Sequence, residues 1–194
     1  MVKQSVSDRL PTQPQPLDLL VIASTAIALL FWIAFPANWL TGLILLLAAA
    51  AQAIRLSRWG GHRTAGDPLV LVLHLGYVWI PIGLALLGLS IAGANIPESA
   101  GVHALTAGAM TTMILAVMSR ASLGHTAREL KAAPMTVAAY VLVTLGALVR
   151  VAASLGIGPY AIMLDEAGLL WGSALLLFLI VYRPILWQPR LGEK

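Results

Sequence analysis

Six apolar segments, each long enough to cross a bilayer, constrain this chain more than any other feature of its sequence. A transmembrane helix needs about 20 mostly apolar residues to cross ~30 Å of hydrocarbon. Because 59% of the residues are hydrophobic and only 10% are charged, the chain has more apolar surface than a soluble domain of its size can bury. We therefore predict an all-α integral membrane protein in contact with the lipid bilayer. The predicted spans are Leu17–Phe35, Leu40–Leu56, Pro68–Ala92, Ala100–Met118, Met135–Leu155 and Ala161–Tyr182.

The positions of the basic residues predict the orientation of the six spans. Eleven of the twelve Lys and Arg residues lie in the tails or at the connections on one side of the bilayer, and none lies in the three connections on the other side. Connections rich in Lys and Arg stay in the cytoplasm, so both termini are predicted to be cytoplasmic. The eleven residues are Lys3, Arg9, Arg55, Arg58, Arg63, Arg120, Arg128, Lys131, Arg183, Arg190 and Lys194.

One membrane domain, residues 17–182, is expected between two cytoplasmic tails, residues 1–16 and 183–194. The first tail is polar and rich in proline, which argues against a signal peptide and favours disorder. With no cysteine, the possible metal ligands are His, Met, Tyr and carboxylate side chains. No GxGxxG, Walker, GxSxG or HExxH motif is present, and no sizeable soluble segment offers a nucleic-acid surface. Any chemistry is therefore expected inside the membrane.

Arg150 is the twelfth basic residue, and it lies within the fifth span about one turn from the non-cytoplasmic end. Burying an unpaired guanidinium there costs ~2.5–3.5 kcal/mol or more, so a partner is expected. Asp165 and Glu166 open the next span on the same side, and we predict that one of them pairs with Arg150. Such a cluster has two interpretations: a structural ion pair, or a site that binds an anionic group.

Three histidines lie within or beside the spans. His74 is about two turns inside the third span and shares a helical face with Tyr77 and small residues, so either a flat cofactor or a neighbouring backbone can fill the space. A hydrogen-bonded histidine inside the bundle is the alternative. Counting ~1.5 Å per residue from the turn near Asn95 places His74 and His103 ~20 Å apart in depth, so they cannot ligate one iron. His125, in the following cytoplasmic loop, is able to fold back toward His74.

The fourth span is predicted to carry ligands on one face and packing residues on another. Ala104 and Gly108 form a small-xxx-small pair suited to close helix contact. At ~100° per residue, one narrow face is formed by His103, Thr106, Met110, Met113 and Val117. Methionines at such positions are more often core residues than ligands. If the histidines are not ligands, the next candidates are Met110, Met113, Tyr77 and Met163.

Three features of the chain resemble the NnrS family. They are HLGYVWIPIGLALLGL at His74–Leu89, HALTAGAMTTMILAVMSRASLGHTAR at His103–Arg128, and the intramembrane Arg150. The resemblance extends from Arg58 onward and corresponds to the C-terminal half of longer family members. It implies a multi-pass, haem- and copper-containing protein of the bacterial inner membrane, linked to denitrification and to relief of nitric oxide stress.

The resemblance also implies which residues surround the cofactor. We expect haem b with His74, His103 and His125 as candidate ligands, Tyr77 beside the cofactor, and Arg150 close to the propionates. An iron with an open sixth position would suit nitric oxide binding or sensing. Copper is a further expected metal, and a second copy of the chain is a candidate partner.

Two other functional classes stay open at this point. In one, the protein is a small transporter or channel in which Arg150 and Asp165 or Glu166 line an anion or proton path. In the other, it is an assembly subunit without chemistry. Whether it is an enzyme is not decided by the sequence. A purified protein with a Soret band would favour haem, and a colourless one that takes up no haemin would favour transport or assembly.

Overall fold

The computed structural model describes residues 15–191, with only the backbone of His62 and Arg63, so the predicted tail at 1–16 lies almost entirely outside the described residues. The predicted all-α class with six spans is confirmed, because six helices in the described range are long and apolar enough to cross a membrane. The elements are α2 (Pro16–Ala34), α3 (Trp39–Ser57), the 3-10 helix η1 (Gly61–Thr64), α4 (Pro68–Ile91), α5 (Glu98–His103), the π-helix η2 (Ala104–Met110), α6 (Thr111–His125), α7 (Pro134–Ser154) and α8 (Tyr160–Trp187). The fourth span is continuous through α5, η2 and α6.

Short capping interactions and glycines set the helix ends. The side chains of Asn38 and Asp67 accept hydrogen bonds from the second backbone amide of α3 and α4, at 2.9 and 3.0 Å. Proline at the first position of α4 and α7 fits a helix start because that position needs no amide hydrogen bond. Gly93 and Gly156 follow the ends of α4 and α7 with positive φ, a conformation that reverses the chain there.

Two helices run further than the predicted spans. The fourth predicted span ends at Met118, but α6 continues to His125, and the sixth ends at Tyr182, but α8 continues to Trp187. Side chains beyond the predicted ends still pack: Leu123 is buried in the same cluster as Tyr182. Hydropathy marks only the hydrocarbon thickness, whereas tertiary contacts keep these helices ordered beyond it.

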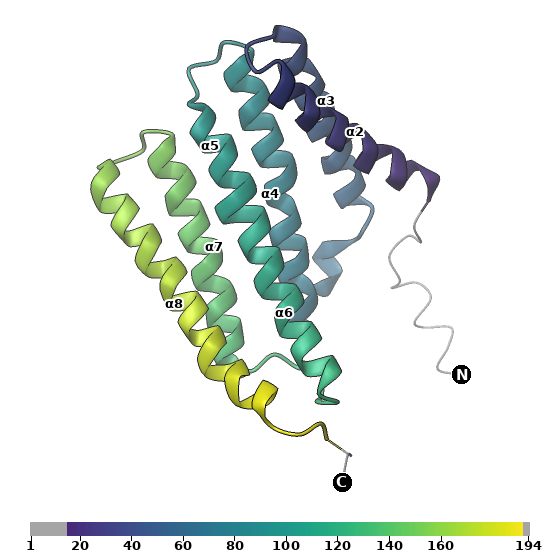
Figure 1. The fold of residues 1–194 in the computed structure, drawn as a ribbon, viewed down its shortest axis with the longest axis vertical. Coiled ribbons are helices and arrows are strands. Elements are labelled where there is room, and N and C mark those ends of the chain that lie inside the picture. Colours follow the sequence, from purple (N-terminus) through teal and green to yellow (C-terminus); the bar gives the residue numbers. More distant parts are fainter. Residues whose placement is uncertain (1–14, 192–194) are drawn as a thin grey trace.

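The six spans form a row, with α4 at its centre (Figure 1). On one side α4 packs against α3, and α3 against α2; on the other it packs against α5, η2 and α6, followed by α7 and α8. The two outer helices, α2 and α8, have only 11% of their apolar windows buried. The candidate sites described below therefore lie in grooves between neighbouring helices of a row.

Glycines allow the central helices to approach closely. Gly88 of α4 lies against the carbonyl of Gly42 in α3, and Gly108 lies against the ring of Trp79. The predicted Ala104–Gly108 packing pair is confirmed, since Ala104 is fully buried and a Cβ at Gly108 would lie 2.5 Å from Trp79. Backbone contacts of this kind are a main source of helix association in lipid.

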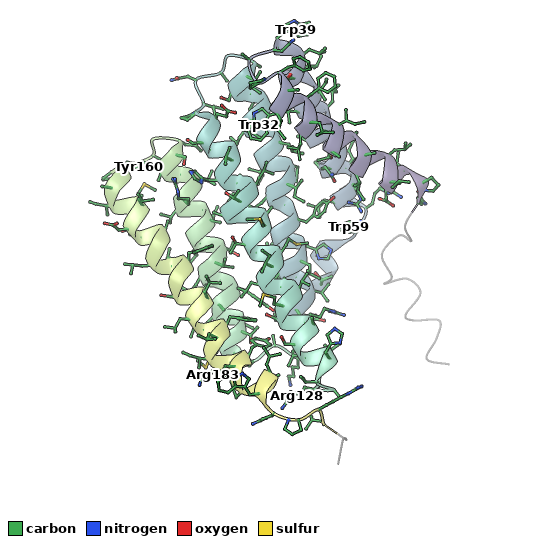
Figure 2. All side chains as sticks on the ribbon, viewed as in Figure 1. Trp32, Trp39, Trp59, Arg128, Tyr160 and Arg183 are labelled. Atoms are coloured by element: carbon green, nitrogen blue, oxygen red, sulfur yellow. The ribbon has the colours of Figure 1, made fainter. Side chains whose placement is uncertain are left out.

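Arg128 and Arg183 lie at one end of the bundle along the helix axes, and Trp39 and Tyr160 lie toward the other end (Figure 2). We call the end with Arg128, Arg183 and the α3–α4 connection the basic end. Trp and Tyr are typical of membrane interfaces, and clustered arginines are typical of the cytoplasmic face. Because consecutive spans alternate in direction, α2 begins and α8 ends on the same side of the bilayer.

The prediction that this side is cytoplasmic is testable with a topology reporter. A reporter fused after Lys194 is expected to show cytoplasmic activity, because the basic connections resist export. A matched fusion in the connection between α4 and α5 is expected to show the opposite location. If the first fusion is active outside the cytoplasm, the predicted orientation of all six spans is wrong.

Candidate functional site

The packing of α4 against α5, η2 and α6 fixes the depth of each histidine. Gly101 lies against Leu87, and Gly76 lies against Met113. In this antiparallel register His103 is level with about residue 85 of α4, roughly three turns or about 16 Å from His74 along the axis. The prediction that the two histidines lie at different depths is confirmed, and they cannot ligate one metal ion.

His74 is partly buried near the basic end, and its ring is held from two sides. Its Nδ1 lies 3.0 Å from the carbonyl oxygen of Val70, which can only accept, so Nδ1 carries the ring proton. The ring lies edge-on to Trp59, with centroids 6.1 Å apart, and contacts the Cα of Gly61 so closely that a Cβ there would lie 2.6 Å from it. This tautomer leaves the Nε2 lone pair available, the arrangement in which histidine binds metals.

An apolar groove between α3 and α4 adjoins His74. Two cavities of about 580 and 320 Å³ share Leu56, Ser57 and Val78, and His74 lines the smaller one. The larger is lined by alanines of both helices and by Pro81, so the small face predicted above His74 is present as open space. These volumes are in the range of small-molecule and cofactor sites. We call this space, with His74 at its end, the His74 groove.

Tyr77 is predicted to lie beside a cofactor, but it belongs to a hydrogen-bond network on the α2 side of α4. Its hydroxyl accepts from Arg55 and donates to Gln52. Gln52 in turn donates to Thr25 at 2.7 Å, and Arg55 forms an ion pair of 3.0 Å with Asp18. This network, which joins three helices, satisfies polar groups that would be costly in lipid.

Sequence reasoning missed most of this network, although one signal was present. Gln52 lies inside a predicted span, and a polar residue there needs a partner. Asp18 and Arg55 lie near span ends, where charges are ordinary at the membrane interface. Trp59 contacts both His74 and Tyr77 and carries the Arg55 guanidinium over its ring at 4.8 Å, which links the network to the His74 groove.

Replacing Gln52 with leucine is expected to destabilise the protein by about 1–3 kcal/mol, because it removes the acceptor of Tyr77 and the donor of Thr25 in a buried place. Thermal unfolding in detergent measures the change. Ser57→Ala is the control, because the Ser57 hydroxyl is exposed and bonds only its own helix, at Ile54. Equal melting temperatures for Gln52→Leu and wild type would contradict a stabilising role.

His125 is predicted in a loop able to reach His74, but it is the last residue of α6 and is exposed. In the antiparallel register of α4 with α6, His125 is level with residues near 63, before the start of α4. This depth is again about three turns from that of His74. The structure therefore does not bring His74 and His125 together. Continuation of the helix past Met118 removes the freedom on which their pairing depended.

His103 and Arg150 do come together, near the end opposite the basic end. Arg150 donates one hydrogen bond to Nε2 of His103 and another, 2.9 Å long, to the hydroxyl of Ser154. Because arginine can only donate, His103 Nε2 is an acceptor and its lone pair is occupied. In this arrangement His103 is not available as a metal ligand, in contrast to His74.

The predicted ion pair of Arg150 with Asp165 or Glu166 is absent among the described residues. The helix face of α8 that meets α7 is set by Ala167, which is buried and whose carbonyl approaches Gly146. Successive residues rotate by ~100°, so Asp165 and Glu166 point away from α7, and both are exposed. The prediction was wrong because adjacency in sequence does not determine helix rotation.

The predicted single face from His103 to Val117 is also interrupted. Seven residues, Ala104–Met110, form a π-helix, whose wider turns shift the angle at which later residues project. Met113 consequently packs against Gly76 of α4, whereas Met110 is 55% exposed. The π-helix begins directly after His103, and such distortions are frequent at functional sites.

A cavity of about 220 Å³ lies beside His103 and Arg150, between η2, α7 and α8. The described residues contain no group of three or more His, Cys, Asp or Glu side chains that could hold a metal ion. Two separate polar positions remain: the His74 groove and the His103–Arg150 cavity.

Comparison with known protein families decides what kind of protein this is. A family model described as NnrS protein matches residues 1–190. The chain belongs to the NnrS family. The match includes the residues before Arg58, and therefore α2 and α3 as well as the segments that first suggested the family. No significant match was found among curated proteins or solved structures.

NnrS membership fits a nitric-oxide-associated, multi-pass membrane protein. The motifs that carried the resemblance now have positions in the NnrS fold described here: His74–Leu89 forms most of α4, and His103–Arg128 covers η2 and α6. Each motif begins with a histidine, and the two histidines differ in tautomer and depth. In this NnrS chain Nε2 of His74 has no hydrogen-bond partner among the described residues, whereas Nε2 of His103 accepts a hydrogen bond from Arg150.

Proposed function

We propose that this NnrS protein is a haem b protein of the bacterial inner membrane that binds nitric oxide, with His74 as its haem ligand. The observation that carries the proposal is the state of the His74 ring: Nδ1 donates to Val70, Nε2 has no hydrogen-bond partner among the described residues, and the ring lines an apolar groove. No other histidine whose side chain is described combines these three features.

The residues around His74 fit a flat apolar cofactor. The groove lies between helices whose facing residues are alanine, proline and other apolar side chains, so a largely apolar ring system replaces lipid contacts without burying unpaired polar groups. Gly61 and Trp59 restrict the imidazole, and the Val70 carbonyl raises its basicity as a ligand. These contacts orient the ring before any cofactor binds.

When bound, haem would be held by His74 and would supply an iron that takes a diatomic ligand. The chain would contribute Nε2 of His74, the orientation of its ring and an apolar surrounding that excludes water. The depth separation of His74 from His103 and His125 supports ligation by one histidine of this chain.

Absorption spectroscopy of the purified protein tests the proposal. A Soret band, a pyridine haemochrome spectrum of haem b, and a shift of the Soret band on addition of nitric oxide to the reduced protein are expected. Haemin added to the same detergent without protein controls for uptake by the micelles. A colourless protein that takes up no haemin would overturn the proposal and favour the transporter or assembly alternatives.

A further inference from the structure

The charge of Arg150 is not neutralised within the described part of the chain. Its hydrogen-bond partners, Ser154 and His103, are neutral in these contacts, and its guanidinium lies 5.9 Å from the ring centre of Tyr160. No carboxylate of the described residues forms an ion pair with Arg150, whereas Asp18 of α2 pairs with Arg55 and Arg58. A permanently charged group at this depth, without an anion, carries a cost that a ligand would remove.

Space for such a ligand is present beside the guanidinium. The cavity of about 220 Å³ has His103 and Arg150 as its charged or titratable lining residues, and its remaining lining is apolar or small, including Ala107, Gly146 and Gly168. The volume suits a molecule of a few heavy atoms and is well below that of the His74 groove. An anion there would meet a low-dielectric surrounding, in which its attraction to Arg150 is strengthened.

The contacts of Arg150 also indicate the shape of the anion. His103 and Ser154 hold the guanidinium in one orientation, so its planar fork is fixed before binding. A fork of this kind matches two oxygens in one plane, the geometry of a carboxylate. His103 accepts a hydrogen bond rather than supplying charge, so it positions Arg150 without neutralising it.

We propose that the His103–Arg150 cavity binds a small planar monoanion of the carboxylate class, with Arg150 as the binding residue and His103 as a positioning residue. The site is distinct from the His74 groove, since the two share no lining residue and differ in depth by about three turns, roughly 16 Å. A carboxylate in this place can come from a free small acid or from a propionate of a haem bound elsewhere than at His74.

Formate is the probe. Binding is measured on haem-free protein in detergent by broadening of the carbon-13 formate NMR signal and by the rise in melting temperature with formate relative to chloride at equal ionic strength. Wild type is expected to bind formate in preference to chloride. Arg150→Gln is expected to abolish binding, and Arg150→Lys, which keeps the charge but loses the fork, to weaken it by at least about tenfold.

Arg183→Gln is the matched control, because it removes an arginine at the basic end, over the ring of Trp187, and is expected to leave formate binding unchanged. Should Arg150→Gln fail to fold, Ala107→Leu fills the cavity while keeping Arg150, and it is expected to abolish binding as well. No formate-specific signal in wild type, or equal binding by Ala107→Leu, would overturn the proposal.

Loading with haemin distinguishes the two sources of the carboxylate. Formate binding that persists in the haem-loaded protein supports a free anion as the ligand. Competition by haemin, with loss of formate binding, supports a haem propionate as the source of the carboxylate. Formate binding to the haem-free protein does not depend on His74, so the formate experiment can fail while the haem proposal stands, and the reverse.

Discussion

Replacing His74 with alanine is expected to abolish the Soret band of the purified protein, because His74 has the free Nε2 and the adjoining apolar groove. The change removes only a side chain that is partly buried, so the helices should remain folded by circular dichroism. Haem content, measured as pyridine haemochrome per mole of protein, is expected to fall from near stoichiometric to background. The effect is large because the other histidines with described side chains are about three turns away in depth.

Three variants serve as controls for this loss. His74→Gly with added imidazole is expected to recover a Soret band, since free imidazole can occupy the vacated space next to Gly61. His103→Gln keeps an acceptor for Arg150 and is expected to retain haem, as is His125→Ala, whose side chain is exposed. Equal loss of haem from the His74 and His103 variants, with both folded, would contradict the assignment of His74.

Replacing Gly88 with valine is expected to cause a large loss of stability at the contact between α3 and α4. An added Cβ would lie 2.9 Å from the backbone oxygen of Gly42 and 2.8 Å from Leu46, and backbone cannot move aside as a flexible side chain can. Overpacking typically costs about 1–3 kcal/mol and occasionally more. Because α3 and α4 form the His74 groove, the variant should also bind less haem.

Gly172→Val is the matched control, since it places the same side chain in α8 at a glycine with no atom within 4 Å of the added Cβ. Its melting temperature in detergent is expected to stay close to that of wild type, whereas that of Gly88→Val falls by several degrees. If the two variants melt alike, the close contact of α3 with α4 does not contribute to stability as the packing indicates.

The two histidines illustrate how one residue type acquires different properties in one family member. Both begin a motif that resembles the NnrS family. His74 lies on α4 and His103 on α5, two elements that pack against each other. A backbone carbonyl holds the ring proton of His74 on Nδ1 and frees Nε2, whereas a guanidinium occupies Nε2 of His103. These neighbours, rather than the motifs, separate the proposed haem position from the proposed anion position.

The sequence by itself determined the class of fold, the six spans and the difference in depth between His74 and His103. Each of these depends on local properties: hydrophobicity over about 20 residues and a rise of ~1.5 Å per residue within one helix. The Ala104–Gly108 packing pair was predictable for the same reason, since two small residues four apart on a helix share a face.

Only the tertiary structure decided which side chains meet. The rotation of α8 turned Asp165 and Glu166 away from Arg150, and the π-helix after His103 shifted Met113 toward α4. The network of Gln52 and Tyr77 and the groove beside His74 likewise depend on how α3 meets α4. Helix rotation and pairing are set by the packing of side chains from separate segments, which hydropathy and spacing along a single segment do not specify.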